Sequence, residues 1–314
     1  MKHLLSFKLL PALLLSFTGG CFFLQNNCAA PELAALGFYA SPGTPETLTH
    51  LRGILKLTPE KRTCFINGKQ FFLPHAVQVD EKGRCRITAL SIEKVLKPLF
   101  SGNQTALPPV RTILLDPGHG GQDLGAKGKK FLEKDLNLAL AKAIAEELKQ
   151  RGFQVRMTRN NDRFLSLDER GKMANRQNAD LFLSIHHNAG ANPASCGAET
   201  YLVTPAGSAS SNDPETQLHK SSVAGNRNDA VNIHLAAAIQ RNMVQATGRT
   251  DRGVRFARFR VLVLSELPGV LIEAGFVSNA AEEQQCGTAS AQKRTARAIA
   301  QAVQELFASG RIIR

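Results

Sequence analysis

Short apolar segments alternate with longer segments of helical periodicity from Arg111 to the end of the chain. The first apolar segment is 112–116, and the helical pattern that follows it covers 132–152. An apolar residue recurs there every four residues, at Leu136, Leu140, Ile144 and Leu148. This alternation is typical of an α/β domain, in which strands form a central sheet and helices cover its faces.

The alternation continues along the rest of this region. Strands are expected at 153–159, 179–188 and 198–203, and helices at 166–178, 232–248 and 289–308. Ser166 followed by Glu169 predicts a capping box at the start of the helix over 166–178. Two further apolar segments, 261–267 and 269–276, flank a Pro-Gly turn. The region 111–314 is therefore expected to form the main domain.

A small β-rich module is expected over residues 51–100. Asn67-Gly68 stands between two short apolar segments and predicts a tight turn between strands. A short helix is expected to end the module, with apolar residues at Ile92, Val95, Leu96 and Leu99. The order of these elements resembles the stalk-like domains of some bacterial wall enzymes. The stretches 21–50 and 101–110 are rich in turn-forming residues and are expected to be linkers.

The N-terminus has the pattern of an export signal. Lys2 and Lys8 are followed by an apolar run, 9–17, which is short for a membrane-spanning helix, so residues 1–20 are expected to be a signal peptide. The residues that end in Cys21 resemble the lipobox of bacterial lipoproteins. A lipid anchor on Cys21 and an ordinary cleaved signal both remain open. Either alternative places the protein in the periplasm or cell envelope.

The charge balance favours an anionic partner. Lys and Arg exceed Asp and Glu by 39 − 26 = +13. The signal region holds two lysines and no acids, so the chain without it keeps 13 − 2 = +11. Such an excess suits nucleic acid, an anionic membrane surface or an acidic polymer. The export signal argues against nucleic acid.

The six cysteines contain no CxxC pair, which argues against a sulfur-rich zinc site. An exported chain can form disulfides. The pairs Cys64–Cys85 and Cys196–Cys286 are one alternative, and unpaired buried thiols are the other.

Five polar residues stand where chemistry is expected. His119 lies in a glycine-rich turn directly after the first strand, and His186 and His187 are near the end of a later strand. Ligands bind at the carboxyl ends of strands in open α/β sheets. Glu133 is near the start of the first helix. Glu273 follows four apolar residues, and a carboxylate in a buried strand is costly unless it is paired or near a metal.

Two histidines and a glutamate form the ligand set of a catalytic zinc site that keeps one position open for water. Glu273 is the type of residue that takes a proton from such a water. Adjacent side chains of a strand point to opposite faces, so at most one of His186 and His187 faces this site. The pattern therefore predicts a hydrolase.

Ordered motifs between residues 111 and 306 closely resemble the zinc-dependent N-acetylmuramoyl-L-alanine amidases (amidase type 3) of bacterial cell walls. These motifs are DPGHGG (116–121), DLGAKG (123–128), EKD (133–135), TRNNDRFLSLDER (158–170), ADLFLSIHHNA (179–189), GAETYLV (197–203), DRGV (251–254) and PGVLIEAGFVSN (268–279). The resemblance implies an α/β fold with a twisted, mixed central sheet flanked by helices. It also implies one zinc ion per catalytic domain. The implied reaction is hydrolysis of the amide between N-acetylmuramic acid and L-alanine, in cell-wall remodelling and daughter-cell separation.

The resemblance also implies roles for particular residues. His119, Glu133 and His186 align with the zinc ligands, since the family pattern Ser-Ile-His-any-Asn places His186 at the ligand position. Glu273 aligns with the catalytic glutamate. Asn188 matches a further family position, where it is expected to support a ligand or contact the substrate. His187 falls at the variable position and is expected to pack beside the site.

The remaining expectations concern partners and access. The basic run 251–260, which ends at Arg260, is expected either to contact stem-peptide carboxylates and anionic wall polymer or to be a solvated face. The implied partners are peptidoglycan or muropeptides and division-associated regulators, without nucleic acid, and the chain is expected to be a monomer. The polar segment 204–230 has little apolar periodicity, which favours a flexible lid over a helix that blocks the site.

Two rival interpretations remain open. The chain could be a peptidoglycan-binding or scaffold protein that keeps the fold without turnover, although all four zinc-site residues are present. Ser91 and Lys94 form an SxxK sequence, as in penicillin-binding proteins, which would add a penicillin-sensitive serine peptidase activity. No Lys-Thr-Gly accompanies it, and short motifs of this kind often arise by chance.

Overall fold

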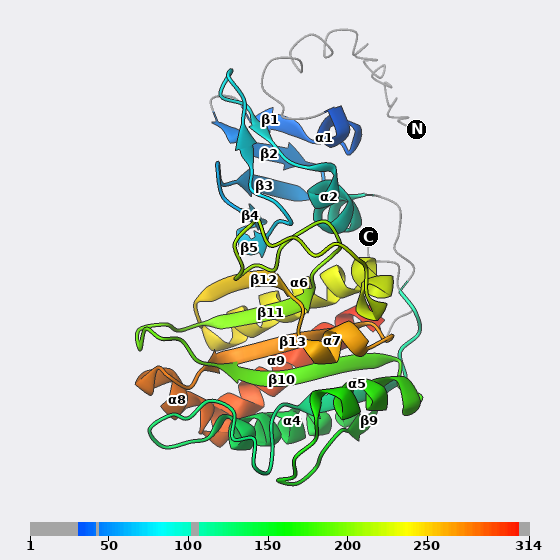
Figure 1. The fold of residues 1–314 in the computed structure, drawn as a ribbon, viewed down its shortest axis with the longest axis vertical. Coiled ribbons are helices and arrows are strands. Elements are labelled where there is room, and N and C mark those ends of the chain that lie inside the picture. Colours follow the sequence, from blue (N-terminus) through cyan, green and yellow to red (C-terminus); the bar gives the residue numbers. More distant parts are fainter. Residues whose placement is uncertain (1–30, 42–43, 102–106, 308–314) are drawn as a thin grey trace, which may run out of the picture.

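The computed structural model describes residues 31–41, 44–101 and 107–307. The expected signal peptide and the expected lipid anchor at Cys21 lie outside these residues. Within the described ranges the chain forms a tall molecule with a small β-rich part at one end and a larger α/β part at the other (Figure 1). No helix in these ranges is long and apolar enough to cross a lipid bilayer.

A single mixed sheet of eleven strands runs through both parts of the described chain. Its spatial order is β1-β2-β3-β4-β5-β12-β11-β13-β10-β8-β9. The strands are β1 (Tyr39–Ser41), β2 (Thr44–His50), β3 (Gly53–Leu57), β4 (Thr63–Ile66), β5 (Lys69–Phe72), β8 (Thr112–Pro117), β9 (Gln154–Met157), β10 (Leu181–Asn188), β11 (Ala198–Val203), β12 (Asp251–Ala257) and β13 (Gly269–Phe276). A separate two-stranded sheet pairs β6 (Gln78–Val79) with β7 (Cys85–Arg86). The predicted α/β class with a mixed central sheet is confirmed.

The centre of the sheet is parallel, which brings several strand ends together. β10 pairs in parallel with both β8 and β13, and β8 pairs in parallel with β9. β11 is antiparallel to β13 and parallel to β12. The carboxyl ends of β8, β10 and β13 therefore lie at the same edge, as expected for a ligand site in an α/β sheet.

Helices cover both faces of the larger part. The helices there are α4 (Glu133–Gln150), α5 (Leu167–Arg176), a 3-10 helix η2 (Ala224–Asn228), α6 (Asp229–Thr247), α7 (Arg260–Leu264), α8 (Ala280–Cys286) and α9 (Ala289–Phe307). The long helices α4, α6 and α9 pack on one face, and α5 and α7 pack on the other. Successive residues of β10 alternate between the two cores, with Leu183 in the first and Phe182 in the second, as the pleat of a strand requires.

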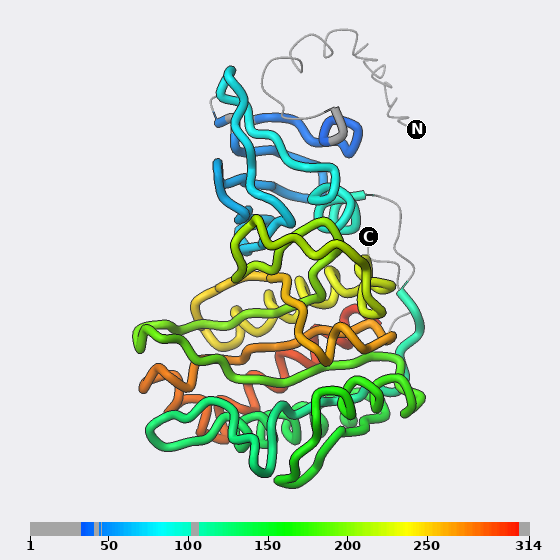
Figure 2. Tube along the Cα trace, viewed as in Figure 1, coloured from blue at the N-terminus to red at the C-terminus, as the bar shows by residue number. Residues whose placement is uncertain are grey.

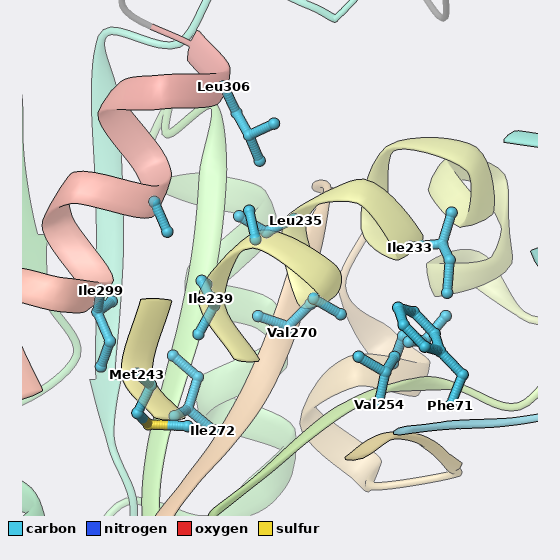
Figure 3. Close-up of a cluster of buried hydrophobic side chains, with 14 of the residues drawn as sticks. Phe71, Ile233, Leu235, Ile239, Met243, Val254, Val270, Ile272, Ile299 and Leu306 are labelled. Atoms are coloured by element: carbon cyan, nitrogen blue, oxygen red, sulfur yellow. The ribbon is translucent and has the colours of Figure 1, made fainter. Parts of the chain in front are cut away.

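The first core is continuous across the junction between the two parts. Phe71 of β5 belongs to the same buried cluster as Val254 of β12 and Ile233 of α6 (Figure 3). Further along, Ile239 and Met243 of α6 face Ile272 of β13 and Ile299 of α9. The small part is therefore packed onto the larger one through buried apolar side chains.

The small part begins earlier than the expected module. A helix α1 (Pro31–Ala35) and strands β1 and β2 lie within the stretch 21–50 that was expected to be a linker. The turn at Asn67-Gly68 is confirmed, and both residues have positive φ (50° and 74°). The expected terminal helix is present as α2 (Ala89–Ser91), a π-helical segment η1 (Ile92–Leu96) and α3 (Lys97–Phe100).

Three elements of the larger part differ from expectation. The apolar segment 261–267 flanks the turn as expected, but its first residues form the helix α7. Strand β12 occupies most of the basic run 251–260, where no strand was expected, and α8 was also missed. The capping box is confirmed, because Ser166 Oγ accepts from the Glu169 N–H and Glu169 accepts from the Ser166 N–H.

Among the described cysteines, the alternative of unpaired thiols is correct, and Cys64, Cys85 and Cys286 are also buried, whereas Cys196 is partly exposed. Cys64, Cys85, Cys196 and Cys286 are all unbonded to one another, so neither predicted disulfide forms. Burial raises the pKa of the Cys286 thiol, and an N–H of Arg249 donates to its sulfur at 3.3 Å. A buried thiol with a raised pKa is a poor nucleophile and behaves as a small packing residue.

Residues 204–223 of the polar segment, called the polar excursion from here on, pack against the small part of the molecule. They do not cover the ends of the central strands. The chain path of residues 204–223 runs between the two parts (Figure 2). Arg62 donates to the carbonyl oxygens of Ala209 (2.6 Å) and Ser210 (2.9 Å), and the Ala76 N–H donates to Glu215. The expectation of a flexible lid is therefore wrong for this segment.

Candidate active site

Three expected metal ligands converge at the carboxyl edge of the central strands. Donor atoms of His119, Glu133 and His186 all lie within 4.8 Å of one another. His119 Nε2 is 3.2 Å from Glu133 Oε2, and His186 Nδ1 is 2.9 Å from Glu133 Oε1. The two imidazole rings meet edge to face, with centroids 5.0 Å apart. Two imidazole nitrogens and one carboxylate form a donor set suited to one divalent metal ion.

His119 is fixed by the loop that follows β8. Its φ of 60° lies in the left-handed region, which costs energy for a residue with a side chain. Two buried arginines hold this loop: Arg159 donates to the Pro117 carbonyl (2.9 Å), and Arg170 donates to the His119 carbonyl (2.6 Å). Arg170 also pairs with the fully buried Asp116 (2.8 Å). These charge-assisted bonds offset the backbone strain.

Asp123 orients the ring of His119. Asp123 Oδ1 lies 2.9 Å from His119 Nδ1, and an ionised carboxylate only accepts, so Nδ1 carries a proton and donates to Asp123. The other ring nitrogen, Nε2, is thereby directed toward Glu133 Oε2, at 3.2 Å. Gly118 leaves the room that the second histidine needs, because a Cβ at this position would lie 2.2 Å from His186 Nε2.

Glu133 begins helix α4 and is held from several sides. Its Oε2 accepts from the Ala126 N–H (2.8 Å), and its Oε1 accepts from the side-chain amide of Asn137 (3.2 Å), one helical turn further on. Burial by itself would raise the pKa of Glu133, but the hydrogen bonds and charges of His119 and His186 outweigh burial and lower it. The carboxyl is therefore ionised and ready to bind a cation.

The histidine pair divides between two environments, as strand alternation predicted. His186 faces the ligand cluster, whereas His187 is buried, and its Nδ1 lies 2.8 Å from Asn137 Oδ1. The Asn137 oxygen accepts, so Nδ1 of His187 donates. Burial lowers the pKa of His187 to about 3, which keeps its ring neutral. The structure therefore connects His187, Asn137 and Glu133 in one chain of hydrogen bonds.

Glu273 lies beside the ligands on the neighbouring strand. It is the register partner of His186, so the two side chains share a face of the sheet. The residue is only 9% exposed, and its Oε2 has no hydrogen-bond partner among the described residues. Burial, together with the charges of Glu133 and Glu199, raises the pKa of Glu273 well above its ordinary value. A buried carboxyl of this kind is suited to accept and return a proton.

A pocket of about 370 Å³ opens over these groups. Its wall includes the three ligand residues, Glu273 and the two residues after His186, and it continues over apolar side chains of α5 and α7. The lining comprises Gly118, His119, Asp123, Ala126, Glu133, Leu167, Arg170, His186, His187, Asn188, Ala189, Phe259, Arg260, Val261, Leu271 and Glu273. No described residue of 204–223 lines it, so the excursion leaves the pocket open.

Asn188 and Arg260, the other predicted contacts, both border the pocket. Asn188 Nδ2 donates to Glu199 Oε2 at 3.0 Å. Arg260 lies at the rim, half exposed, and is paired with Asp168 of α5 (2.7 Å). The basic run is divided by the fold, because Arg252 and Arg255 of β12 turn inward to Glu199.

Sequence reasoning missed Glu199, Asn137 and the two arginines around β8. Glu199 carries the same signal that identified Glu273, since it is an acidic residue in a segment that is otherwise apolar or uncharged. Asn137 stands four residues after Glu133, which places both on one face of a helix. Arg159 and Arg170 carry no local signal, because their partners are backbone carbonyls distant in sequence.

The SxxK serine is not accessible. Ser91 is fully buried, and its Oγ lies 3.1 Å from Thr88 Oγ1. Lys94 is paired with Asp229 of α6 (2.8 Å). A serine nucleophile must reach its substrate and a base. The added penicillin-sensitive activity therefore has no structural support.

An α/β sheet that carries a two-histidine, one-glutamate cluster beside a buried free carboxylate defines a hydrolase class. Comparison with known proteins identifies the family. The family described as N-acetylmuramoyl-L-alanine amidase matches residues 113–305. The chain belongs to this family and is a hydrolase of the amide bond between N-acetylmuramic acid and L-alanine, and the scaffold interpretation is set aside.

Two curated amidases illustrate the similarity. AmiA of Escherichia coli (strain K12) is 32% identical over 220 residues, which cover 63% of this chain and 76% of AmiA. LytC of Bacillus subtilis (strain 168) is 38% identical over 198 residues, which cover 63% of this chain but only 36% of LytC.

Solved structures of amidases are also similar to this chain. The catalytic domain of CwlV from Bacillus (Paenibacillus) polymyxa var. colistinus is 34% identical with a TM-score of 0.51, covering 62% of this chain and 97% of that domain. An N-acetylmuramoyl-L-alanine amidase from Clostridium difficile 630 is 33% identical with a TM-score of 0.53, covering 64% of this chain and 99% of that structure.

Proposed function

We propose that this amidase is zinc-dependent and that His119, Glu133 and His186 hold the ion. The donor chemistry supports the choice, because two imidazoles and one carboxylate with a further position for water are typical of catalytic zinc. Hydrogen bonds to Asp123 and to Asn137 support His119 and Glu133 from behind, as ligands of catalytic metals usually require. When bound, zinc polarises the amide carbonyl and makes a water acidic near neutral pH.

We propose that Glu273 is the proton acceptor. A water attacks the carbonyl carbon of the amide, and Glu273 takes a proton from that water. The same carboxyl then returns the proton to the alanine nitrogen as the carbon–nitrogen bond breaks. The free, buried Oε2 of Glu273 carries this assignment, since an unpaired carboxylate oxygen on the face of His186 has no structural role that explains it.

The pocket wall suggests how a muropeptide would lie. Phe259, Val261 and Leu271 form an apolar side that excludes water from the reacting bond. Asn188 and Arg260 supply polar contacts, the first near Glu273 and the second at the rim, where it can reach a stem-peptide carboxylate. The open mouth suits a polymer substrate, which must enter without being enclosed.

A decisive experiment incubates the purified chain with muropeptides and separates the products by mass spectrometry. Free stem peptides and intact glycans are expected, lost with a chelator and restored by zinc. Glu273→Gln is expected to lower kcat about 10³-fold or more while keeping one zinc per chain. The matched control is Glu305→Gln on the exposed surface of α9, which should retain full activity. Native hydrolysis by Glu273→Gln would contradict the assignment.

We propose that the enzyme acts on peptidoglycan in the cell envelope, after export directed by residues 1–20, and takes part in daughter-cell separation. The basic charge of the chain and the similarity to wall amidases support this placement. The described residues before 102 would serve as an accessory module of the catalytic part. A related amidase, CwlD of Clostridioides difficile, was solved in complex with the GerS lipoprotein. By analogy, a further protein would bind this chain, and the family resemblance favours a division-associated regulator.

A further inference from the structure

Glu199 is a fully engaged, buried carboxylate next to the proposed catalytic residue. It is 1% exposed and is the cross-strand partner of Glu273 in the β11–β13 pair. Its Oε1 accepts from Arg252 Nε (2.6 Å) and from Arg255 (2.9 Å). Its Oε2 accepts from the Tyr201 hydroxyl (2.7 Å) and from Asn188 Nδ2 (3.0 Å). Two arginines neutralise the charge, and four donors fix the orientation of the carboxylate.

This carboxylate dictates the orientation of Asn188. A carboxylate only accepts, so the amide nitrogen of Asn188 must face Glu199, and the amide oxygen accepts from the Ala189 N–H at 2.7 Å. The amide nitrogen has a second N–H, which no described residue accepts. Because Asn188 lines the pocket, this N–H is available to a substrate carbonyl.

The contacts that hold Glu199 in place extend into the small part of the molecule. The guanidinium carbon of Arg255 lies 4.2 Å from the ring centroid of Phe72 on β5. Such a cation–π contact fixes the plane of the guanidinium group. The same arginine donates to Asn212 Oδ1 (2.6 Å) in the polar excursion. Phe72 of the small part is therefore linked to the pocket by a series of contacts through Arg255, Glu199 and Asn188.

We propose that Glu199 is a positioning residue for the amidase reaction: it orients the Asn188 amide toward a carbonyl of the muropeptide, and Phe72 supports it through Arg255. The proposal rests on the proposed function, because it places the substrate in this pocket. The small part of the molecule then contributes to turnover without touching the substrate.

A double-mutant cycle on the full-length, zinc-loaded chain tests the proposal. Asn188→Ala is expected to lower kcat/KM about 10- to 100-fold, since it removes one pre-oriented donor. Arg252→Met loosens Glu199 but keeps its carboxylate and a side chain of similar size. It is expected to cost about 5-fold in the native background and less than about 2-fold in the Asn188→Ala background.

The control for Arg252→Met is Arg241→Met, which removes a half-exposed arginine paired with Glu305. It should leave kcat/KM unchanged. A purely structural role of Glu199 would give the same fold-loss for Arg252→Met in both backgrounds, and that result would overturn the proposal. Glu199→Gln extends the test if it folds. Native kcat/KM in a folded Glu199→Gln chain would also refute the idea.

A second set of variants tests the contribution of the small part of the molecule. Phe72→Leu removes the aromatic ring and keeps an apolar side chain. We expect kcat/KM to fall about 2- to 5-fold with Asn188 present and to stay constant in its absence. Phe65→Leu on the exposed face of β4 is the matched control, expected to be neutral. Equal losses in both backgrounds would remove Phe72 from the proposal.

Failure of this proposal is distinguishable from failure of the proposed function. If Glu273→Gln remains active, the reaction does not use this pocket as assigned. If Glu273→Gln is inactive but the cycle is additive, only the role of Glu199 is refuted. Zinc content is measured for every variant, so that loss of metal is not mistaken for loss of positioning.

Discussion

At the scale of residues, the site depends on side chains that hold other side chains. His119 is kept in a left-handed backbone conformation by carbonyl contacts from buried arginines. Glu133 is kept by Asn137 and by the backbone N–H of His187 (3.3 Å). The reactive groups are therefore oriented before any ligand arrives, which lowers the cost of reorganisation during the reaction.

The two adjacent histidines give a prediction at this scale. His186→Ala removes a ligand, so the chain is expected to lose zinc on dialysis against a weak chelator. His187→Ala removes only a supporting contact to Asn137 and should keep one zinc per chain, with affinity about 10-fold weaker. Competitive titration with a chromophoric chelator measures both. Retention of tight zinc by His186→Ala would contradict the ligand assignment.

Local sequence patterns pointed to the residues that we propose for the reaction, but not to the side chains that support them. The proposed ligands and the proposed proton acceptor stand in local patterns, such as the glycine-rich turn around His119 and the apolar run before Glu273. The supports act across the sheet or between helices. Arg170, for example, reaches Asp116 over 54 positions of sequence, and no periodicity reveals such a contact.

At the scale of elements, helix α5 connects the capping box to the active-site loop. Ser166 caps the helix, and Arg170, one turn later, reaches Asp116 and the His119 carbonyl. The start of α5 is thus fixed in the register that its arginine needs. Loss of the cap is therefore expected to lower the stability of the fold and to disturb the loop that carries His119.

Ser166→Ala is expected to lower the free energy of unfolding by about 1 kcal/mol, the usual contribution of an N-cap side chain. Ser166→Thr should recover most of this loss, because its hydroxyl can make the same bond. Urea denaturation of the zinc-loaded chain measures both variants. A loss in Ser166→Ala below about 0.3 kcal/mol would show that the helix start is held by tertiary contacts instead.

Element type was predicted well where the pattern was long and poorly where it was short. The helix expected over 132–152 is observed as α4 with nearly the same bounds. In contrast, the five-residue helix α7 has the composition of a strand, and its contacts with α5 and η2 decide its conformation. Strand β12 was missed because Arg252 and Arg255, which pair with Glu199, stand among its buried apolar residues and hide the usual apolar signal.

At the scale of the whole molecule, the described chain behaves as one packed body. β5 pairs with β12 at Phe71 and Val254, and one hydrophobic cluster crosses the junction. The close approach is built into the backbone: a Cβ on Gly253 would lie 2.8 Å from the Gln70 carbonyl oxygen. Sequence reasoning did not foresee this, since the pairing partners are separated by most of the chain.

Arg62→Ala tests the cohesion of the two parts. It removes bonds to the Ala209 and Ser210 carbonyls and should lower the free energy of unfolding by about 2 kcal/mol. Calorimetry of the native chain should show one transition. Arg86→Ala, which removes an exposed pair with Asp80, is the control and should change stability by less than about 0.5 kcal/mol. Two separate transitions in the native chain would contradict the single packed body.

The continuous sheet also bears on solubility. In this chain β12 lies between β5 and β11, so its backbone groups do not form an outer edge. A shortened protein that begins at residue 107 would leave β12 as an open border, ready to pair with the same strand of another molecule. Its inward arginines would discourage such pairing only in part. We therefore expect β5, which pairs with β12 at Val254 and Phe71, to shield this strand from self-association, a role independent of catalysis.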